Sequence, residues 1–400
     1  MKRSLLLVLM IFVLAACAPA ATATPLPPTA TATNTAVPPT ATSTPLPPTA
    51  TATSAPTATP TPLYPPEGLG PTGFPVNVDP LTGLKVEDKN ILNRRPVVVK
   101  VENLPRVSRP QWGLSFADIV FEYYTEYGTT RFAAVYYGQN SEQIGPIRSG
   151  RWFDFNVVRM FKSVFVFGSA YAELYSAFLQ SDFGNRIVLE RGASSCPTIC
   201  RVDPNGYNHE VLNLTGFNEY LATWGVDNTV QNQDGMFFNL KTPAGGVPVN
   251  QMFIRFSGSV YNRYDYDTAT GRYMRFVDTK EDMDRASAEY TAMLDRVTGE
   301  QIGIENVVVI VVSYDLVPSS DNREIFSMTL LGEGPAYIMR DGQGYEVRWK
   351  RAKDSNVLTL IDADGNPFAY KPGTTWYEVV GVYSFFTKEA NIWHFEHRIP

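Results

Sequence analysis

Residues 18–66 are the feature that most limits how this chain can fold. The stretch contains no charged residue and consists almost entirely of Thr, Ala and Pro, and the phrase Leu26-Pro27-Pro28-Thr29-Ala30-Thr31 recurs from Leu46 to Thr51. Such a composition buries too little apolar surface to offset the entropy lost on ordering. Residues 17–66 therefore predict a disordered, extended tether, and folded structure is expected only after it.

Residues 1–16 predict a secretory signal peptide, because two cations, Lys2 and Arg3, precede an apolar run that is too short to span a bilayer. The end of this run, Leu14-Ala15-Ala16 before Cys17, resembles the lipobox of bacterial lipoproteins. The resemblance implies that Cys17 carries a diacylglyceryl group, with acyl chains such as palmitate, and becomes the N-terminus. The alternative is an ordinary signal peptide followed by an incidental cysteine. We expect a lipid-anchored protein on the extracytoplasmic face of the cell membrane.

The net charge of the chain limits the kinds of molecule that it is expected to bind. The chain has 34 Lys and Arg against 40 Asp and Glu, and removal of Lys2 and Arg3 leaves 32 against 40, a net charge of −8. A mildly acidic chain without a basic stretch is not expected to bind nucleic acid. The sequence lacks a phosphate-binding glycine loop, a nucleophile elbow and a paired zinc motif, so we expect no cofactor and no metal. The expected partners are the membrane, through the anchor, and a cell-wall glycan or an envelope protein.

Strand and helix patterns alternate in residues 79–230. Runs rich in β-branched and aromatic residues predict strands at 95–101, 131–137 and 163–167. Apolar residues at helical spacing predict helices at 115–124, 152–160 and 171–179, the first capped by Ser115. This order predicts an N-terminal domain of mixed α/β structure, with helices packed on a sheet.

Residues 250–385 predict a second domain of mostly antiparallel strands. Strands are expected at 252–256, 261–267, 271–277, 307–312, 324–331, 345–350, 357–361 and 375–380, separated by turn signals such as Asp364-Gly365-Asn366-Pro367. One helix is expected at 280–295. The two domains together predict an α+β fold.

The densest polar sequence lies between residues 103 and 151. On the predicted helix, Asp118, Glu122 and Glu126 are spaced by four, so they would share one face and need cations to offset their repulsion. Three interpretations remain open: an internal salt-bridge network, a binding site for phosphate, carboxylate or sugar, and a catalytic site. The candidate ligand-binding residues are Asn103, Arg109, Gln111, Glu122, Glu126, Arg131, Arg148, Ser149, Arg151 and His209.

Cys196 and Cys200 are the cysteines that remain beside Cys17. Two cysteines in an exported protein usually pair, so a local disulfide is expected. Free thiols, or a metal site with His209, are the alternatives, although a zinc site needs four ligands and this segment offers three. His209 is also the histidine best placed for proton transfer, since His394 and His397 lie in the C-terminal tail.

Several motifs resemble the YerB-like lipoproteins, a bacterial family with N- and C-terminal domains of unknown function. The resembling segments are Asp79-Pro80-Leu81-Thr82-Gly83-Leu84, Arg95-Pro96, Asn103, Arg109-Pro110-Gln111, Gly113-Leu114, Ala117-Asp118-Ile119-Val120, Glu122, Glu126, Gly128, Thr130-Arg131-Phe132, Ile144-Gly145-Pro146-Ile147-Arg148-Ser149, Arg151, Asn306-Val307-Val308-Val309, Trp349-Lys350, Asp364-Gly365 and Pro372-Gly373-Thr374-Thr375-Trp376. The resemblance implies the fold and the location but no reaction. The chain departs from the family at residues 196–200, and at Asn208-His209, where relatives tend to have His-Asn.

A second likeness concerns an enzymatic alternative. The order of a strand, Pro146-Ile147-Arg148, a helix and Gly168-Ser169 is similar to that of the LytR-CpsA-Psr glycopolymer transferases, which use arginines on a lipid pyrophosphate. We expect a noncatalytic ligand-binding or scaffolding module of the cell envelope. The alternative is an envelope enzyme, a glycan or lipid-phosphate transferase or hydrolase, that uses the arginine cluster.

Overall fold

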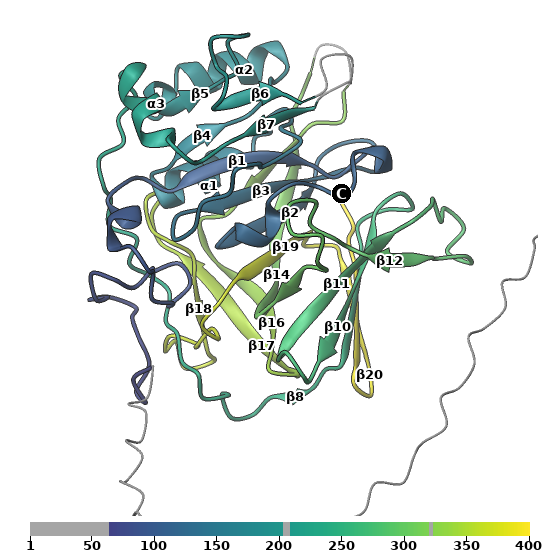
Figure 1. The fold of residues 1–400 in the computed structure, drawn as a ribbon. Helices are drawn as coiled ribbons and strands as arrows, with labels where there is room; N and C mark the ends of the chain where they lie inside the picture. The colour runs from purple at the N-terminus through teal and green to yellow at the C-terminus, as the bar shows by residue number, and fades with distance from the viewer. Residues whose placement is uncertain (1–63, 203–208, 320–322) are drawn as a thin grey trace, which may run out of the picture. The chain divides into compact units, whose positions relative to one another are not determined.

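The computed structural model describes residues 64–202, 209–319 and 323–400. Strands far outnumber helices in this part of the chain, so the fold is mixed α and β but mostly β (Figure 1). The predicted signal peptide, Cys17 and the tether before residue 64 lie outside the described residues. Within the described ranges, no helix has the length and apolarity that crossing a membrane requires.

The largest sheet has twelve strands, and ten of them form a continuous path. In spatial order these are β18 (Thr359–Ile361), β17 (Gln343–Arg351), β16 (Gly332–Arg340), β14 (Asn306–Leu316), β19 (Thr375–Gly381), β2 (Ile119–Tyr124), β3 (Thr130–Tyr136), β1 (Val97–Glu102), β4 (Val164–Val166) and β5 (Ile187–Val188). Two more strands lie off this path: β15 (Phe326–Thr329) pairs with β14, and β8 (Val247–Pro248) pairs with β17.

The second sheet has seven strands, and its path is β12 (Tyr290–Ala292), β11 (Arg272–Asp278), β10 (Tyr261–Asp267), β9 (Gln251–Arg255), β21 (Ile392–Glu396) and β20 (Phe385–Glu389), with β13 (Gly303–Ile304) paired to β11. A two-stranded sheet joins β6 (Ile199–Arg201) and β7 (Glu210–Leu212). The described α-helices are α1 (Asp154–Phe161), α2 (Ala172–Leu179) and α3 (Phe217–Thr223), and the 3₁₀ helices are η1 (Lys89–Leu92), η2 (Arg106–Ser108), η3 (Leu114–Phe116) and η4 (Gly184–Arg186).

The large sheet combines strands from both sequence regions. β2, from residues 79–230, pairs in parallel with β19, from residues 250–385, and Glu122 lies opposite Glu378 in this register. β19 also pairs in parallel with β14, so the C-terminal half of the sheet continues the N-terminal half without a break. The two regions therefore share one backbone hydrogen-bond network, although the sequence divides them.

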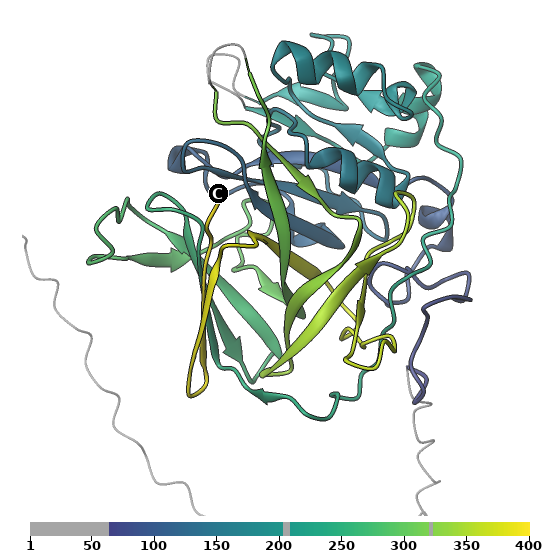
Figure 2. The ribbon, with the colours of Figure 1, turned by 180° about the vertical axis from the view of Figure 1, so that it is seen from behind.

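Residues 119–124 form the strand β2, and the prediction of a helix at 115–124 is wrong. Only η3 precedes the strand. Phe121 packs with tilted rings against Phe153, which precedes α1, and Phe161 at the end of α1, and this helix packs across this face of the sheet (Figure 2). Glu122 points to the opposite face, where it contacts Arg275 of the second sheet. Both faces of β2 are covered, so its residues are apolar at nearly every position. Such a run lacks the alternation of a half-buried strand, and its apolar residues also fit the spacing of a helix.

The prediction of a helix at 280–295 is also wrong. The segment forms turns and then β12, which pairs with β11. Asp282 explains the difference, because its carboxylate accepts hydrogen bonds from the backbone N–H and the hydroxyl of Ser287, at 2.8 and 3.3 Å. Side-chain bonds of this kind compete with the helical backbone pattern. The predicted helices at 152–160 and 171–179 are confirmed as α1 and α2.

Candidate functional site

The three acids that were expected on one helix face lie in three different surroundings. Because β2 is a strand, the spacing of four places Asp118 just before it, Glu122 within it and Glu126 in the turn that follows. Asp118 and Glu122 are fully buried, whereas Glu126 is partly exposed. The expected repulsion along one helix face therefore does not arise, and each acid has its own partners.

Glu122 belongs to a buried cluster that joins the two large sheets. Arg275 of β11 donates to Glu122 and, at 2.7 Å, to Oε1 of Glu378. The amides of Asn103 and Asn262 donate to the two oxygens of Glu122, each at 3.0 Å. All five side chains are shielded from solvent. Most polar groups in this cluster are engaged with one another, as expected for an interior that cannot offer water, while Asn262 Oδ1 and Glu378 Oε2 accept no hydrogen bond from the described residues.

Glu126 holds a second group of predicted residues together. The Arg151 guanidinium donates to Oε2 of Glu126 at 2.6 Å, and Arg131 forms an ion pair with the same carboxylate at 3.2 Å. Arg131 also donates to the carbonyl oxygen of Ser149 at 2.8 Å. Burial by itself would raise the pKa of Glu126, but the hydrogen bond from Arg151 and the charge of Arg131 outweigh burial and lower it. Glu126 is therefore an ionised structural partner.

Arg109 and Arg148 also take part in ion pairs. Arg109 donates to the backbone and side-chain oxygens of Asp278, at 2.7 and 3.1 Å, which links it to the second sheet. The Arg148 Nε lies 2.8 Å from Oε1 of Glu102, and Gln111 donates to the carbonyl oxygen of Glu102 at 3.0 Å. The arginine cluster therefore corresponds to the salt-bridge interpretation. The enzymatic alternative stays a prediction, and in the structure the arginines that it would use have carboxylate partners.

His209 is at the edge of this second set of contacts. Its ring meets the ring of Trp112 edge-on, with 6.4 Å between the centroids. Burial raises the pKa of Glu102, while the charges of Arg148 and His209 lower it, so His209 lies beside the Arg148–Glu102 pair. The ten predicted residues thus fall into three groups, around Glu122, Glu102 and Glu126, instead of converging on one cleft.

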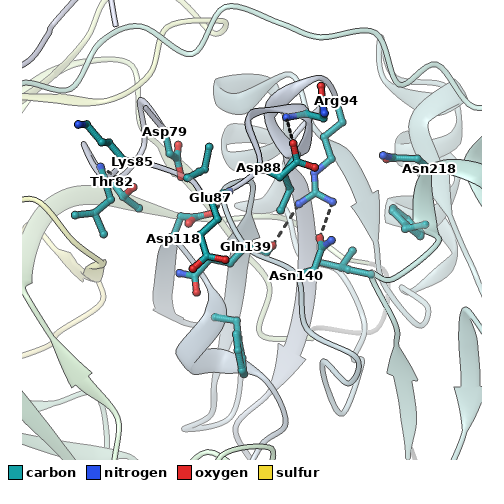
Figure 3. A pocket seen from close by; sticks show the side chains of 18 of the residues that line it. Asp79, Thr82, Lys85, Glu87, Asp88, Arg94, Asp118, Gln139, Asn140 and Asn218 are labelled. Atoms are coloured by element: carbon teal, nitrogen blue, oxygen red, sulfur yellow. Dashed lines mark hydrogen bonds between the residues drawn. The ribbon is translucent and has the colours of Figure 1, made fainter. Parts of the chain in front are cut away.

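A different site is more open. A pocket with a volume of about 840 Å³ lies between the loop before β1, the end of β3 and the start of α3 (Figure 3). We call it the acidic pocket. Its lining includes Asp79, Lys85, Glu87, Asp88, Asn90, Arg94, Phe116, Asp118, Gln139, Asn140, Phe217, Asn218 and Glu219.

Two carboxyl groups lie beneath this pocket. Asp79 Oδ1 accepts from the Leu81 N–H at 2.8 Å, and Asp118 Oδ2 accepts from the N–H of Gly138 at 3.1 Å. The remaining oxygens, Asp79 Oδ2 and Asp118 Oδ1, are buried, and the described residues offer them no other donor. Burial and the charge of Asp118 raise the pKa of Asp79 well above its usual value, and burial raises the pKa of Asp118 to about 6. Both shifts favour the protonated form, so we expect the pair to share a proton below about pH 6.

Gly138 makes room for this pair. A Cβ atom at position 138 would lie 2.4 Å from Asp79 Oδ2, a distance that no side chain tolerates. The glycine is the second residue after β3, and its N–H donates to Asp118. The loop that carries Asp79 can therefore approach the end of the sheet closely only because residue 138 has no side chain.

Arg94 is the cation at the base of the pocket. It donates to Oδ1 of Asn140 at 2.8 Å and to the carbonyl oxygens of Tyr137 and Gln139, at 3.0 and 3.3 Å (Figure 3). Burial lowers the pKa of Arg94, and the negative charge of Asp118 opposes this effect. Arg94 thus fixes the turn after β3 that supplies part of the pocket wall.

The rim of the pocket is polar, exposed and mostly acidic. Lys85, Glu87, Asn218 and Glu219 are exposed there, and within the described ranges none of the three charged residues among them forms an ion pair. Two aromatic rings, Phe116 and Phe217, also reach the lining. Asn218 Oδ1 accepts from Asn228 at 2.8 Å, but its amide N–H groups and the carboxylates of Glu87 and Glu219 face the pocket and can bind a ligand.

Sequence reasoning did not select this site. Asp79-Pro80-Leu81-Thr82-Gly83 was recognised only as a resembling segment, and Asp118 was assigned to a helix face. A usable signal was present: an Asp-Pro-Leu-Thr-Gly run is typical of a turn stabilised by its own aspartate, and the N–H groups of Leu81, Thr82 and Gly83 do return to Asp79.

Cys196 and Cys200 lie close together in the structure. Cys196 and Cys200 are placed as a disulfide-capable pair, with 5.1 Å between their Cα atoms. Among the residues that the structure covers, no group of three or more His, Cys, Asp or Glu side chains is arranged to hold a metal ion.

Comparison with known proteins identifies relatives of this chain. Residues 81–205 match the N-terminal domain of the family described as "Protein of unknown function (DUF3048)", and residues 252–377 match its C-terminal domain. The protein named "Putative lipoprotein YerB" from Bacillus subtilis (strain 168) is 29% identical over 304 residues, which cover 75% of this chain and 85% of the relative. The crystal structure of YerB from Bacillus subtilis has a TM-score of 0.62 at 25% identity and covers 76% of this chain and 96% of that one.

Proposed function

This chain belongs to the DUF3048 family and contains both its N- and C-terminal domains. From that premise we propose that it is a membrane-anchored lipoprotein of the cell envelope. We propose further that its folded part binds a polar ligand in the acidic pocket. The observation that carries the proposal is the pocket itself, in which a carboxyl pair and Arg94 form the base and unpaired polar groups form the rim. Pockets with a few convergent polar groups are the usual sites of ligand binding.

The location rests on Cys17 and on the relative. The relative's name describes it as a lipoprotein, and Cys17 follows a lipobox-like segment. Acyl chains attached there hold a protein in a membrane, because each buried methylene contributes about 0.8 kcal/mol. Cys17→Ala is expected to release the protein from the membrane fraction while its thermal unfolding stays unchanged. A variant that still sediments with membranes would contradict the anchor.

The chemistry of the lining favours a glycan that is neutral or cationic. A carboxylate such as that of Glu219 accepts from sugar hydroxyls, an amide such as that of Gln139 accepts and donates, and the partly exposed ring of Phe116 offers apolar surface. The excess of acids over cations disfavours anionic polymers. An envelope polysaccharide built from N-acetylglucosamine or glucosamine fits these requirements, and scaffolding of envelope proteins is the alternative within the same class.

The test is titration of the full chain, purified in detergent, with tetramers of β-1,4-linked N-acetylglucosamine and of glucosamine. Gln139→Ala and Asn218→Ala each remove an exposed amide from the pocket, so each is expected to weaken binding by roughly threefold to tenfold. Asn185→Ala, an exposed asparagine outside the pocket, serves as the matched control. No binding of either oligosaccharide, or equal losses in the control, would contradict the proposal.

A further inference from the structure

A second, oppositely charged pocket lies elsewhere on the molecule. It has a volume of about 500 Å³, and its charged lining consists of Arg95, Arg159, Lys162, Arg186, Asp182 and Asp354. Four cations and two acids therefore meet in one pocket of a chain whose overall charge is negative. We call it the basic pocket.

Segments far apart in the sequence assemble the basic pocket. Arg95 precedes β1, Arg159 and Lys162 lie at the end of α1, Arg186 ends η4, and Asp354 belongs to the loop after β17. Figure 2 shows α1 beside this yellow-green loop, and Arg351 of β17 donates to Asn156 of α1 at 3.1 Å. The site is therefore built from the folded core and does not rest on a single exposed loop.

Two of the four cations already have close carboxylate partners. Arg95 forms an ion pair with Asp227, and it donates to the Lys162 carbonyl oxygen at 2.8 Å. Arg159 lies 2.8 Å from Asp182 and 3.9 Å from Asp354. These contacts hold the walls of the pocket in place and use up its acids.

Lys162 and Arg186 are held by neutral oxygens instead. Lys162 Nζ donates to the carbonyl oxygen of Asn232 at 2.7 Å, and Arg186 donates to the carbonyl oxygens of Ser163 and Asp182, at 3.1 and 3.5 Å. Within the described ranges, neither side chain lies in an ion pair with a carboxylate. The N–H groups that remain can each take another acceptor.

Both cations would gain from an anion. Burial lowers the pKa of Lys162, and the charge of Asp234 opposes that effect. Burial and the neighbouring charge of Arg95 lower the pKa of Arg186, and the negative charges of Asp182 and Asp227 oppose this effect. A bound oxyanion would relieve the desolvation of both groups.

We propose that the basic pocket binds a phosphate group through Lys162 and Arg186. An ammonium and a guanidinium that approach from two elements can share the oxygens of one phosphate, which suits Arg especially because of its planar donors. The neutral groups of Gln231 and Ser355 line the same pocket and can contact the remainder of the ligand. The volume exceeds that of a phosphate ion, so the ligand is a phosphate ester, either a soluble one or a phospholipid headgroup.

Isothermal titration of the full chain in a nonionic detergent tests this site, with inorganic phosphate, glycerol 3-phosphate and a short-chain phosphatidylglycerol as probes at constant ionic strength. Lys162→Gln and Arg186→Gln are each expected to weaken binding by about tenfold, because each removes one charge-assisted hydrogen bond. Tighter binding of glycerol 3-phosphate would identify a soluble ester, and tighter binding of phosphatidylglycerol would identify a headgroup.

Two further variants keep the test decisive. Asp182→Asn keeps the side-chain shape but removes one negative charge from the pocket, so binding is expected to tighten by a few-fold. Arg272→Gln removes an exposed arginine of β11 that pairs with Glu305, and it controls for net charge. No binding by the wild-type chain, an unchanged affinity in Asp182→Asn, or equal losses in Arg272→Gln would overturn the proposal, whatever the acidic pocket binds.

Discussion

The arginine groups and the acidic pocket contain similar residue types but use them differently. Around Glu122, the guanidinium of Arg275 bridges carboxylates and joins the two sheets, with 2.7 Å to Glu378. Around Glu126, two guanidinium groups contact one carboxylate at 2.6 and 3.2 Å. In the acidic pocket, burial raises the pKa of both Asp79 and Asp118, and the rim charges of Glu87 and Glu219 have no ion-pair partner in the described chain. A segment rich in polar residues therefore does not by itself identify a binding site. Its polar groups can bind a ligand only where other protein groups do not already occupy their hydrogen-bonding positions.

The difference follows from where each region lies. Arg275 connects β11 to both Glu122 and Glu378, so any polar group left without a partner there would cost stability with no solvent to compensate it. The acidic pocket lies at the end of the large sheet, where the loop before β1 ends and solvent can reach the rim. A ligand can replace water at that rim, whereas nothing can enter the cluster between the sheets.

The largest expected effect comes from removing the cation between the sheets. Arg275→Met leaves Glu122 and Glu378 buried and facing each other, and it is expected to lower the free energy of unfolding by about 3–5 kcal/mol. Denaturant titration of the full chain measures the change. Arg272→Met, an exposed position on the same strand, is the control. A loss below about 1 kcal/mol, the range of a surface ion pair, would show that the cluster is not structural.

A smaller loss is expected at the base of the acidic pocket. Gly138→Ala places a methyl group against Asp79 Oδ2, so the loop with Asp79 must shift, at a cost of about 1–3 kcal/mol. Because the shift also changes the shape of the pocket, oligosaccharide binding should weaken even under conditions in which the variant remains folded. Gly192→Ala is the control for backbone strain without a clash: the φ of Gly192 is +69°, and no atom lies within 4 Å of the place where a Cβ would be added. Normal stability and normal binding in Gly138→Ala would contradict the proposed packing.

Most of the expected strands are confirmed, because a strand can be recognised from the pattern of apolar residues within its own short segment. The runs at 95–101 and 307–312 were correctly placed as β1 and β14. Residues 119–124 were not, because burial on both faces removes the alternation that distinguishes a strand from a helix. The pairing of β2 with β19 depends on contacts more than 250 residues apart, which no local pattern encodes.

The candidate site was harder to predict for the same reason. The sequence indicated the arginines and their acids, and the structure shows that Arg109 reaches Asp278 and that Glu122 reaches Arg275, both from the second sheet. These partners lie about 150 or more residues away, so the sequence could not show that the cluster is internally paired. The proximity of Asp79 to Asp118 depends equally on the fold.

The last prediction uses pH to separate the two regions. Burial raises the pKa of Asp118 to about 6 and that of Asp79 well above its usual value, whereas an unfolded aspartate titrates near 3.9. The folded state therefore binds protons more tightly than the unfolded state, so the stability from this pair is present below about pH 4 and is lost as pH rises through about 6 and beyond. The pKa of Glu126 is lowered, so its contribution is present above about 4.3 and is lost as pH falls.

Asp79→Asn tests this sign directly. The amide keeps the acceptor for the Leu81 N–H and can donate to Asp118, so it reproduces the protonated state at every pH. Relative to the wild type, the variant is expected to gain on the order of 1 kcal/mol of stability between about pH 5 and pH 8, measured by denaturant unfolding at each pH. Glu126→Gln should instead lose stability most above about pH 5, because Arg131 and Arg151 then lack their carboxylate. If Asp79→Asn and the wild type showed the same dependence on pH, the carboxyl pair would not share a proton, and both acids at the bottom of the acidic pocket would be ionised, as Glu126 is.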